Sequence, residues 1–242
     1  MENNTKITPV SIILLLALVA GITFMATKYG YQKKYENAPT DQDAGKDLSK
    51  IKLNPVSPDE HILGSYADAK IFIVEFSDLE CPYCKQFHSA MHKAMDNYGN
   101  KIAWVYRAFP LDKPRPDGSI LHSKAGAEAR GAECMAELGG NDAFWKYTDK
   151  IFDITPSNNG LDLSIMPSIA ASFGVDKNKF NDCIITNAIK VKVESQYEDG
   201  ATAGVTGTPT SFILDRSGKI IDMIGGYEPY ADLQKQIDKD LR

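Results

Sequence analysis

The motif Cys81-Pro82-Tyr83-Cys84 constrains this chain more than any other feature, because it directly follows an apolar segment with the pattern of a buried strand. Proline suits the first position of a helix, so a helix is predicted to begin within the motif. The first cysteine then lies at the amino end of that helix, where backbone N–H groups and the helix dipole favour negative charge. A thiolate is the form of cysteine that exchanges disulfides, and the motif therefore predicts a redox pair.

A metal site is the alternative interpretation of the two thiols. Cys81, Cys84 and His88 would form half of a zinc site, but four-ligand zinc sites usually combine two such clusters, and the sequence contains no second one. Copper binding through the same thiols is also open. We favour redox chemistry, with Cys81 as the exposed, attacking thiol and Cys84 as the resolving thiol.

The elements around the motif indicate the fold class. Strands over 70–76 and 102–109, joined by a helix over 82–98, form a βαβ unit whose strands are expected to be parallel and buried. After a long region that is expected to be wholly helical, the chain returns to two strands joined by a tight turn and ends in an amphipathic helix. These later elements are predicted over 119–138, 142–152, 164–173, 177–186 and 187–203 (helices), 211–215 and 219–224 (strands) and 229–241 (helix). This order is that of an α/β thioredoxin fold with an all-helical insertion.

The amino-terminal segment 10–26 carries no charge and, as a helix, would span about 25 Å, near the lower limit for crossing a bilayer. A cleaved signal peptide is the alternative, although the segment ends in Phe24-Met25-Ala26, which puts a bulky residue at position −3 of the cleavage site. A buried core helix is not favoured, because the segment has no polar face. We expect one uncleaved transmembrane anchor.

Two signals conflict on which side of the membrane the rest of the chain lies. Three lysines follow the apolar segment: Lys28, Lys33 and Lys34. By the positive-inside tendency, they would place the rest of the chain in the cytoplasm. Four cysteines, an even number, are instead typical of an oxidising compartment. We expect a single-pass protein of the cell membrane with its catalytic domain outside the cytoplasm. A net charge of −5 and the lack of a basic stripe argue against a nucleic-acid partner.

These features divide the chain into four parts. The divisions are a membrane anchor or signal peptide over 1–27, a polar tether over 28–60, a thioredoxin domain over 61–118 and 204–242, and a helical insertion over 119–203.

Three stretches carry a resemblance to a known family. They are 74–84, with the pattern Phe-Ser-Asp-x-x-Cys-Pro-x-Cys, 127–134 together with Phe144-Trp145, and 204–212, with Gly-Thr-Pro-Thr before a strand. In these stretches the chain resembles the DsbA-like thiol:disulfide oxidoreductases of bacterial envelopes, and their membrane-tethered branch in particular, over about residues 60–241. Glutaredoxins also contain Cys-Pro-Tyr-Cys, but they are far shorter and unanchored.

The resemblance implies roles for residues outside the cysteine pair. Glu75 would lie beneath the disulfide and relay protons to the inner thiol, which a buried carboxyl with a raised pKa can do; an ordinary edge-strand charge is the alternative. Pro209 would form a cis-proline loop against the redox pair, where the backbone of Thr208 can pair with an extended substrate. Pro82 and Tyr83 would also contact the substrate.

The resemblance further implies a structural disulfide between Cys134 and Cys183; two buried free thiols are the alternative. Strongly oxidising relatives carry histidine where Tyr83 stands, and Glu80 would oppose thiolate formation, so a weaker oxidant is expected. The histidines show no nucleophile–base pattern, and His88 and His92, one turn apart on a helix, are expected to be solvated.

Together these features predict an extracytoplasmic enzyme that introduces disulfides into reduced or unfolded exported proteins. The resemblance implies a quinone-linked membrane partner of the DsbB or vitamin-K-epoxide-reductase type that reoxidises the pair, and no bound cofactor, because the cysteines carry the electrons. A disulfide reductase or isomerase is the enzymatic alternative, and a metal chaperone or holdase is the non-enzymatic one.

Overall fold

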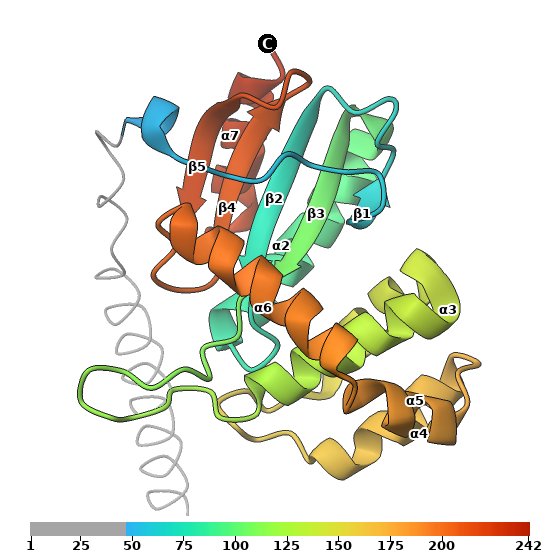
Figure 1. Ribbon diagram of the computed structural model, residues 1–242. Helices are drawn as coiled ribbons and strands as arrows, with labels where there is room; N and C mark the ends of the chain where they lie inside the picture. The colour runs from blue at the N-terminus through green and yellow to red at the C-terminus, as the bar shows by residue number, and fades with distance from the viewer. Residues whose placement is uncertain (1–46) are drawn as a thin grey trace, which may run out of the picture. The chain divides into compact units, whose positions relative to one another are not determined.

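The computed structural model describes residues 47–242, which fall in one compact unit (Figure 1). The predicted anchor over 1–27 and the predicted tether as far as residue 46 lie outside the described residues. Between residues 47 and 242, none of the helices combines the length and the apolar character that a membrane crossing needs.

A mixed five-stranded sheet forms the centre of the unit, with strand order β1-β3-β2-β4-β5. Its strands are β1 (His61–Gly64), β2 (Ile71–Ser77), β3 (Ile102–Ala108), β4 (Thr210–Asp215) and β5 (Ile220–Gly225). β2 and β3 are parallel, as their βαβ connection requires, and the other three pairings are antiparallel. The thioredoxin-type α/β fold predicted from the order of elements is confirmed in this part of the chain.

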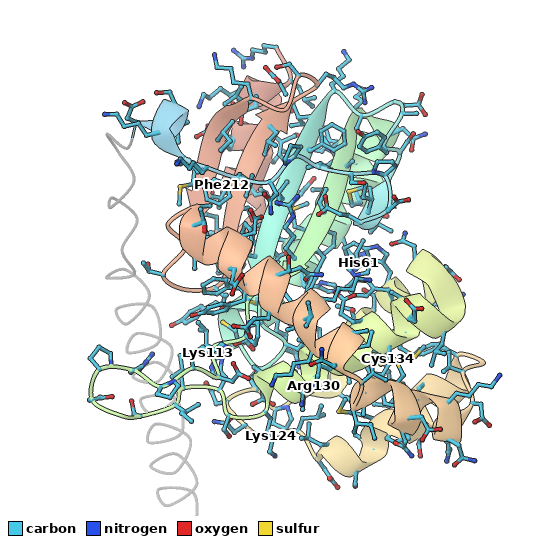
Figure 2. The ribbon with its side chains drawn as sticks, in the orientation of Figure 1. His61, Lys113, Lys124, Arg130, Cys134 and Phe212 are labelled. Carbon is cyan, nitrogen blue, oxygen red and sulfur yellow. A yellow bond between two sulfur atoms is a disulfide. The ribbon has the colours of Figure 1, made fainter. Side chains whose placement is uncertain are left out.

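Strand β1 was not predicted. It has only four residues, too few to show a hydrophobic period, and it ends at Gly64, whose φ of +99° favours glycine. Its first residue, His61, contacts Glu133 of the helical region at 2.9 Å and stacks on Phe144 with ring centroids 3.8 Å apart. These contacts place His61 where the sheet meets the helices (Figure 2).

Helices cover both faces of the sheet (Figure 1). α2 (Pro82–Tyr98) and α7 (Tyr230–Asp240) share one face, and α6 (Asn187–Thr202) crosses the other. Alternate residues of β2 separate accordingly: Phe72, Val74 and Phe76 belong to the core on the α6 side, whereas Ile71 and Ile73 belong to the core under α2.

The helical region differs at its start from the prediction. Its helices are α3 (Ala125–Ile154), α4 (Met166–Ser172), α5 (Lys177–Ile184) and α6, and a short 3-10 turn at Leu163–Ile165 directly precedes α4. Two further 3-10 turns, Leu48–Lys50 and Gly99–Lys101, lie outside this region. The predicted helix over 119–138 is wrong before Ala125, because His122 bonds through its backbone to Leu111 and through its ring to Asp78, which holds this stretch out of a helix. α3 kinks at Gly140, where φ is +78°, the position at which the sequence predicted a helix end.

A disulfide ties this region together. Cys134 on α3 (Figure 2) is bonded to Cys183 on α5, with an S–S distance of 2.09 Å and a Cα–Cα distance of 5.9 Å. Both residues are buried.

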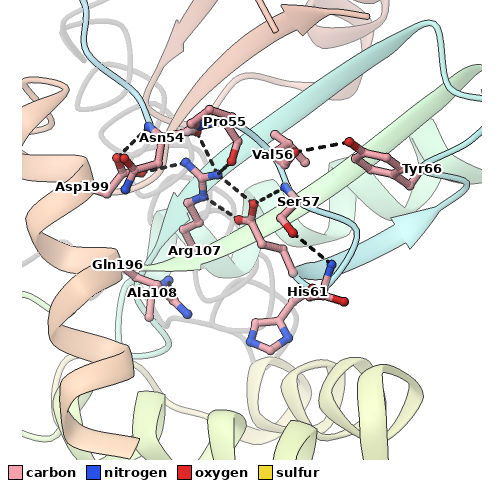
Figure 3. A network of polar contacts seen from close by, with 12 residues as sticks. Asn54, Pro55, Val56, Ser57, His61, Tyr66, Arg107, Ala108, Gln196 and Asp199 are labelled. Carbon is pink, nitrogen blue, oxygen red and sulfur yellow. Dashed lines mark hydrogen bonds and ion pairs between the residues drawn. The ribbon is translucent and has the colours of Figure 1, made fainter. Parts of the chain in front are cut away.

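Residues 47–60, the last part of the predicted tether, pack onto the α6 side of the sheet. The side chains of Ile51, Leu53 and Val56 contact the core there. A buried ion-pair network fixes the same stretch (Figure 3): Arg107 donates to Glu60 at 2.7 Å and to Asp199 at 2.7 Å. Arg107 also donates to the backbone oxygen of Asn54 at 3.1 Å, so a single guanidinium joins this stretch, β3 and α6.

Candidate redox site

The two cysteines of the motif lie where β2 leads into α2. Cys81 is the residue before the helix, with extended φ and ψ of −80° and 122°, and Pro82 occupies the first helical position. Cys81 was expected to be exposed at the end of the helix, but only 3 % of its surface is accessible, so this expectation is wrong. Cys81 lines a cleft of about 480 Å³, together with Pro82 and Tyr83. A substrate therefore has to enter this cleft to meet the thiol.

The two thiols differ sharply in acidity. Hydrogen bonds from the Cys84 thiol and, with a smaller effect, from the Thr208 side chain lower the pKa of Cys81 to about 7 against the opposing effect of burial. Burial raises the pKa of Cys84 well above the ordinary value. Near neutral pH, Cys81 is thus the nucleophile and Cys84 is a protonated thiol beside it. The roles of Cys81 as attacking thiol and Cys84 as resolving thiol stay a prediction, with which these two pKa directions agree.

Glu75 lies on the α2 side of the sheet and is fully buried. Burial raises its pKa to about 7, although hydrogen bonds, including one from Trp104 Nε1 to Oε2 at 2.8 Å, favour the ionised form. The carboxyl is close enough to Cys84 to raise the pKa of that thiol in turn. It can therefore hold or release a proton near neutral pH in the interior, next to the thiol that needs one.

The loop before β4 closes the site from the opposite side. The Thr208–Pro209 peptide bond is cis, and the carbonyl oxygen of Thr208 accepts a hydrogen bond from the Cys81 thiol at 3.3 Å. Thr208 also lines the cleft. Residues 127 positions apart in sequence are thereby brought together, as the resemblance implied.

Sequence reasoning missed a buried pair beside the motif. Asp78 Oδ2 lies 2.8 Å from His122 Nδ1 and accepts a hydrogen bond from the backbone N–H of Leu111 at the same distance. Burial would lower the pKa of His122, but the contact with Asp78 raises it above the ordinary value, with a smaller contribution from Cys81. His122 lines the cleft, and its protonated form favours a thiolate nearby, whereas the Asp78 carboxylate raises the pKa of Cys81. Asp78 belongs to the motif pattern, but His122 lies 44 positions away without any local signal.

Glu80 has a different setting from the one expected. It is fully buried, accepts a hydrogen bond from the backbone N–H of Asn159, and adjoins Glu128. Burial and the neighbouring Glu80 raise the pKa of Glu128 to about 10, so this second carboxyl is protonated. The carboxylate that raises the pKa of Cys81 is that of Asp78.

His88 does not join the two cysteines. Its Nε2 lies 2.7 Å from Asp149 Oδ1, and no group of potential metal ligands among residues 47–242 contains His88 together with Cys81 or Cys84. His88 is 5 % exposed, so the expectation that it is solvated is wrong; aromatic rings from β3 and α3 surround it.

Comparisons with known proteins agree with this geometry. A model of the thioredoxin family matches residues 56–239. The chain is 25 % identical to DsbA2 of Pseudomonas aeruginosa, with a TM-score of 0.61 over 77 % of this chain and 96 % of that one. BdbD of Bacillus subtilis in its oxidised form shares the fold at 19 % identity, with a TM-score of 0.63 over 79 % of this chain and 98 % of that one.

Curated sequences of another name also match. The chain is 31 % identical over 164 residues to a protein of Mycolicibacterium vanbaalenii named Na(+)/H(+) antiporter NhaA 1, a match that covers 66 % of this chain. The chain spans about a quarter of the length of the curated relatives it matches. The family match and the DsbA-type structures nevertheless agree with the site on one assignment: the chain belongs to the thioredoxin family, within its DsbA-like thiol:disulfide oxidoreductases.

Proposed function

We propose that this protein is an oxidase that passes a Cys81–Cys84 disulfide to reduced exported proteins outside the cytoplasm. The observation that carries the proposal is the contrast between the two thiols, with a pKa of about 7 for Cys81 and a strongly raised pKa for Cys84. Such a contrast gives each sulfur one role in disulfide exchange.

The exchange balances without a bound cofactor. A substrate thiolate attacks Cys81 in the oxidised enzyme, the S–S bond breaks, and Cys84 leaves with the electron pair and takes up a proton. Glu75 supplies that proton through the interior, since its pKa is about 7. A second substrate thiolate then attacks the substrate sulfur of the mixed disulfide and releases Cys81 as a thiolate. The substrate has lost two electrons, and the enzyme pair has gained them.

The cleft supports an extended, unfolded substrate. The carbonyl oxygen of Thr208 and the wall formed by Pro82 and Tyr83 flank Cys81. Hydrogen bonds between the two backbones depend little on the side chains of the substrate. Such binding has low sequence selectivity, which suits a catalyst that acts on many proteins.

Location and reoxidation belong to the same proposal. The Cys134–Cys183 disulfide supports an oxidising compartment, and the apolar segment 10–26 supports a single-pass anchor in the cell membrane. The reduced enzyme then needs an electron acceptor, for which we propose a quinone-linked membrane protein of the DsbB or vitamin-K-epoxide-reductase type.

One observation favours a reductase or isomerase as the second candidate. A pKa of about 7 for Cys81 matches that of thioredoxin, a reductase, and lies above the value of about 3.5 for DsbA. A less acidic Cys81 stabilises the reduced form less, so the disulfide is a weaker oxidant. Tyr83 in place of a histidine supports the same direction.

The test is to trap the mixed disulfide. In Cys84→Ala the remaining Cys81 thiolate can attack a disulfide of an exported protein, the reverse of the proposed exchange, and no Cys84 thiol is left to break the mixed disulfide, so we expect disulfide-linked complexes to accumulate in cells. Cys81→Ala is the matched control and should trap none. If Cys84→Ala cells hold no more complexes than Cys81→Ala cells, the proposal is wrong, and a binding role such as that of a holdase takes its place.

A further inference from the structure

A second cluster of reactive side chains lies on the far part of α2, outside the redox cleft. His88 and His92 are one helical turn apart and present their rings on one side of α2, where Asp149 of α3 meets them. The three side chains border a hollow of about 440 Å³ to which Lys85, Ser89 and Asp153 also contribute. None of them contributes to the proposed exchange reaction.

The three ligand atoms form a compact triangle. His88 Nε2 lies 2.7 Å from Asp149 Oδ1, His92 Nε2 lies 2.9 Å from the same oxygen, and the two nitrogens are 3.2 Å apart. Ligands at 2.0–2.1 Å from a tetrahedral Zn²⁺ ion are separated from one another by about 3.3 Å. To bind the ion, the His88 Nε2–Asp149 Oδ1 distance therefore has to lengthen by about 0.6 Å, the largest of the three changes. Side-chain rotation can supply this without moving either helix.

The chemistry of the three groups suits a borderline metal ion. Burial lowers the pKa of His88, so its ring is neutral, and Nε2 has a lone pair for the ion in the tautomer that carries the proton on Nδ1. Partial burial opposes ionisation of Asp149, but hydrogen bonds from the two histidines hold its pKa below the usual range, so it is a carboxylate. Two imidazoles and one carboxylate favour Zn²⁺, Co²⁺, Ni²⁺ or Cu²⁺ over Ca²⁺ and Mg²⁺, which prefer oxygen ligands alone.

We propose that His88, His92 and Asp149 form a binding site for one divalent transition-metal ion of the Zn²⁺ class. Water completes the coordination, because the side chains of His92 and Asp149 are 37 % and 42 % exposed and leave the outer position open to solvent. The ion joins α2, which carries the redox pair, to α3 of the helical region.

Packing around the cluster holds the His88 ring in place. Phe152 and Trp104 lie on it, with ring centroids 4.5 Å and 4.9 Å away. Its other nitrogen, Nδ1, is buried without a hydrogen-bond partner among residues 47–242. Because a partner on that nitrogen usually strengthens metal binding by 10- to 100-fold, we expect an exchangeable ion of moderate affinity.

The surroundings also provide an optical reporter. Both tryptophans of the chain, Trp104 and Trp145, lie beside His88, at ring-centroid distances of 4.9 Å and 6.4 Å. A paramagnetic ion such as Co²⁺ or Ni²⁺ at the cluster should therefore quench the intrinsic tryptophan fluorescence. Zn²⁺, which is not paramagnetic, should restore the fluorescence by displacing the paramagnetic ion.

The experiment uses the full-length chain without a histidine tag and with Cys81 and Cys84 oxidised, so that these thiols cannot bind metal. Titration with Co²⁺ should quench the fluorescence with one ion bound per chain, and Zn²⁺ should compete. Asp149→Asn and His92→Ala should each weaken binding by at least about tenfold. Asp153→Asn is the matched control: Asp153 also borders the hollow but pairs with Lys150, and its loss should leave the affinity unchanged.

Two outcomes overturn the proposal. One is the lack of saturable quenching by Co²⁺ in the wild-type chain, and the other is an equal affinity in Asp149→Asn, His92→Ala and Asp153→Asn. A thermal melt provides a check that is independent of fluorescence: Zn²⁺ should raise the Tm of the wild type and of Asp153→Asn but not that of Asp149→Asn. His92 and Asp149 are partly exposed, so both variants are expected to fold.

Discussion

Glutamine at position 75 would remove a proton-binding group from the interior while keeping the shape of the side chain. Burial raises the pKa of Glu75 from 4.5 to about 7, and one pKa unit corresponds to about 1.4 kcal/mol. Ionising this carboxyl in the folded protein therefore costs about 3 kcal/mol more than ionising it in the unfolded chain.

The sign of the pH dependence follows from the raised pKa. Below pH 4.5 the carboxyl is protonated in both states, and its contribution to the free energy of unfolding is fully present. As the pH rises from 4.5 to about 7, the unfolded chain releases the proton first, so folding becomes less favourable. Between pH 5 and pH 8 this group lowers the free energy of unfolding by about 2.5 kcal/mol.

Glu75→Gln lacks this contribution. From pH 5 to pH 8, the free energy of unfolding of the variant should therefore rise by about 2.5 kcal/mol relative to that of its parent. Urea unfolding at several pH values measures it, with both proteins in a Cys81→Ser background so that the active-site disulfide is absent while the structural one stays intact. The exposed Glu137→Gln is the control and should change stability by less than about 0.5 kcal/mol at every pH. A difference between Glu75→Gln and its parent that stays constant with pH would refute the raised pKa.

Three further substitutions and one alkylation measurement test separate features of the protein. Trp104→Phe removes the donor 2.8 Å from Glu75. Because a hydrogen bond to a charged group is worth about 1.5–3 kcal/mol, its loss should raise the pKa of Glu75 and shift the pH profile of disulfide reduction to higher pH. An unchanged profile would show that the bond is unimportant. The alkylation rate of Cys81 by iodoacetamide should reach half its maximum near pH 7, and a midpoint above pH 8 would contradict the acidic thiol. Cys134→Ser should lower the free energy of unfolding by about 4 kcal/mol and leave the reduction potential of the active pair unchanged, which a redox titration and urea unfolding can check together. Arg107→Ala leaves the buried carboxylate of Asp199 and the partly buried one of Glu60 without this partner and should cost about 3–5 kcal/mol, so a loss below 1 kcal/mol in urea unfolding would contradict the role given to that network.

The predictable part of the site lies in local sequence. The strand before Cys81 and the proline after it are adjacent in the chain, so hydrophobic pattern and helix-start preference were enough to place the thiol at the end of a helix. The cis bond at Pro209 was not accessible in this way. Only the resemblance implied it, because most bonds before proline are trans.

What the sequence could not provide depends on contacts between distant segments. His122 reaches Asp78 across 44 positions, and nothing in its neighbourhood marks it as part of the site. The pair also explains why the helix begins at Ala125 and not at 119. Strand β1 was missed for a related reason: four residues are too short for a period, and pairing with β3 and the contact of His61 with Glu133 hold it in place.

The central claim is that Cys81 and Cys84 donate a disulfide, and their oxidation state in growing cells tests it most directly. Acid quenching followed by a thiol-specific alkylating reagent that adds mass separates the oxidised from the reduced chain, with the Cys134–Cys183 disulfide as an internal reference. We predict that most of the protein carries the Cys81–Cys84 disulfide, and that deleting the reoxidising partner proposed above shifts the pair to the dithiol. A pair that is mostly reduced in otherwise unperturbed cells would contradict the oxidase and favour a reductase or isomerase.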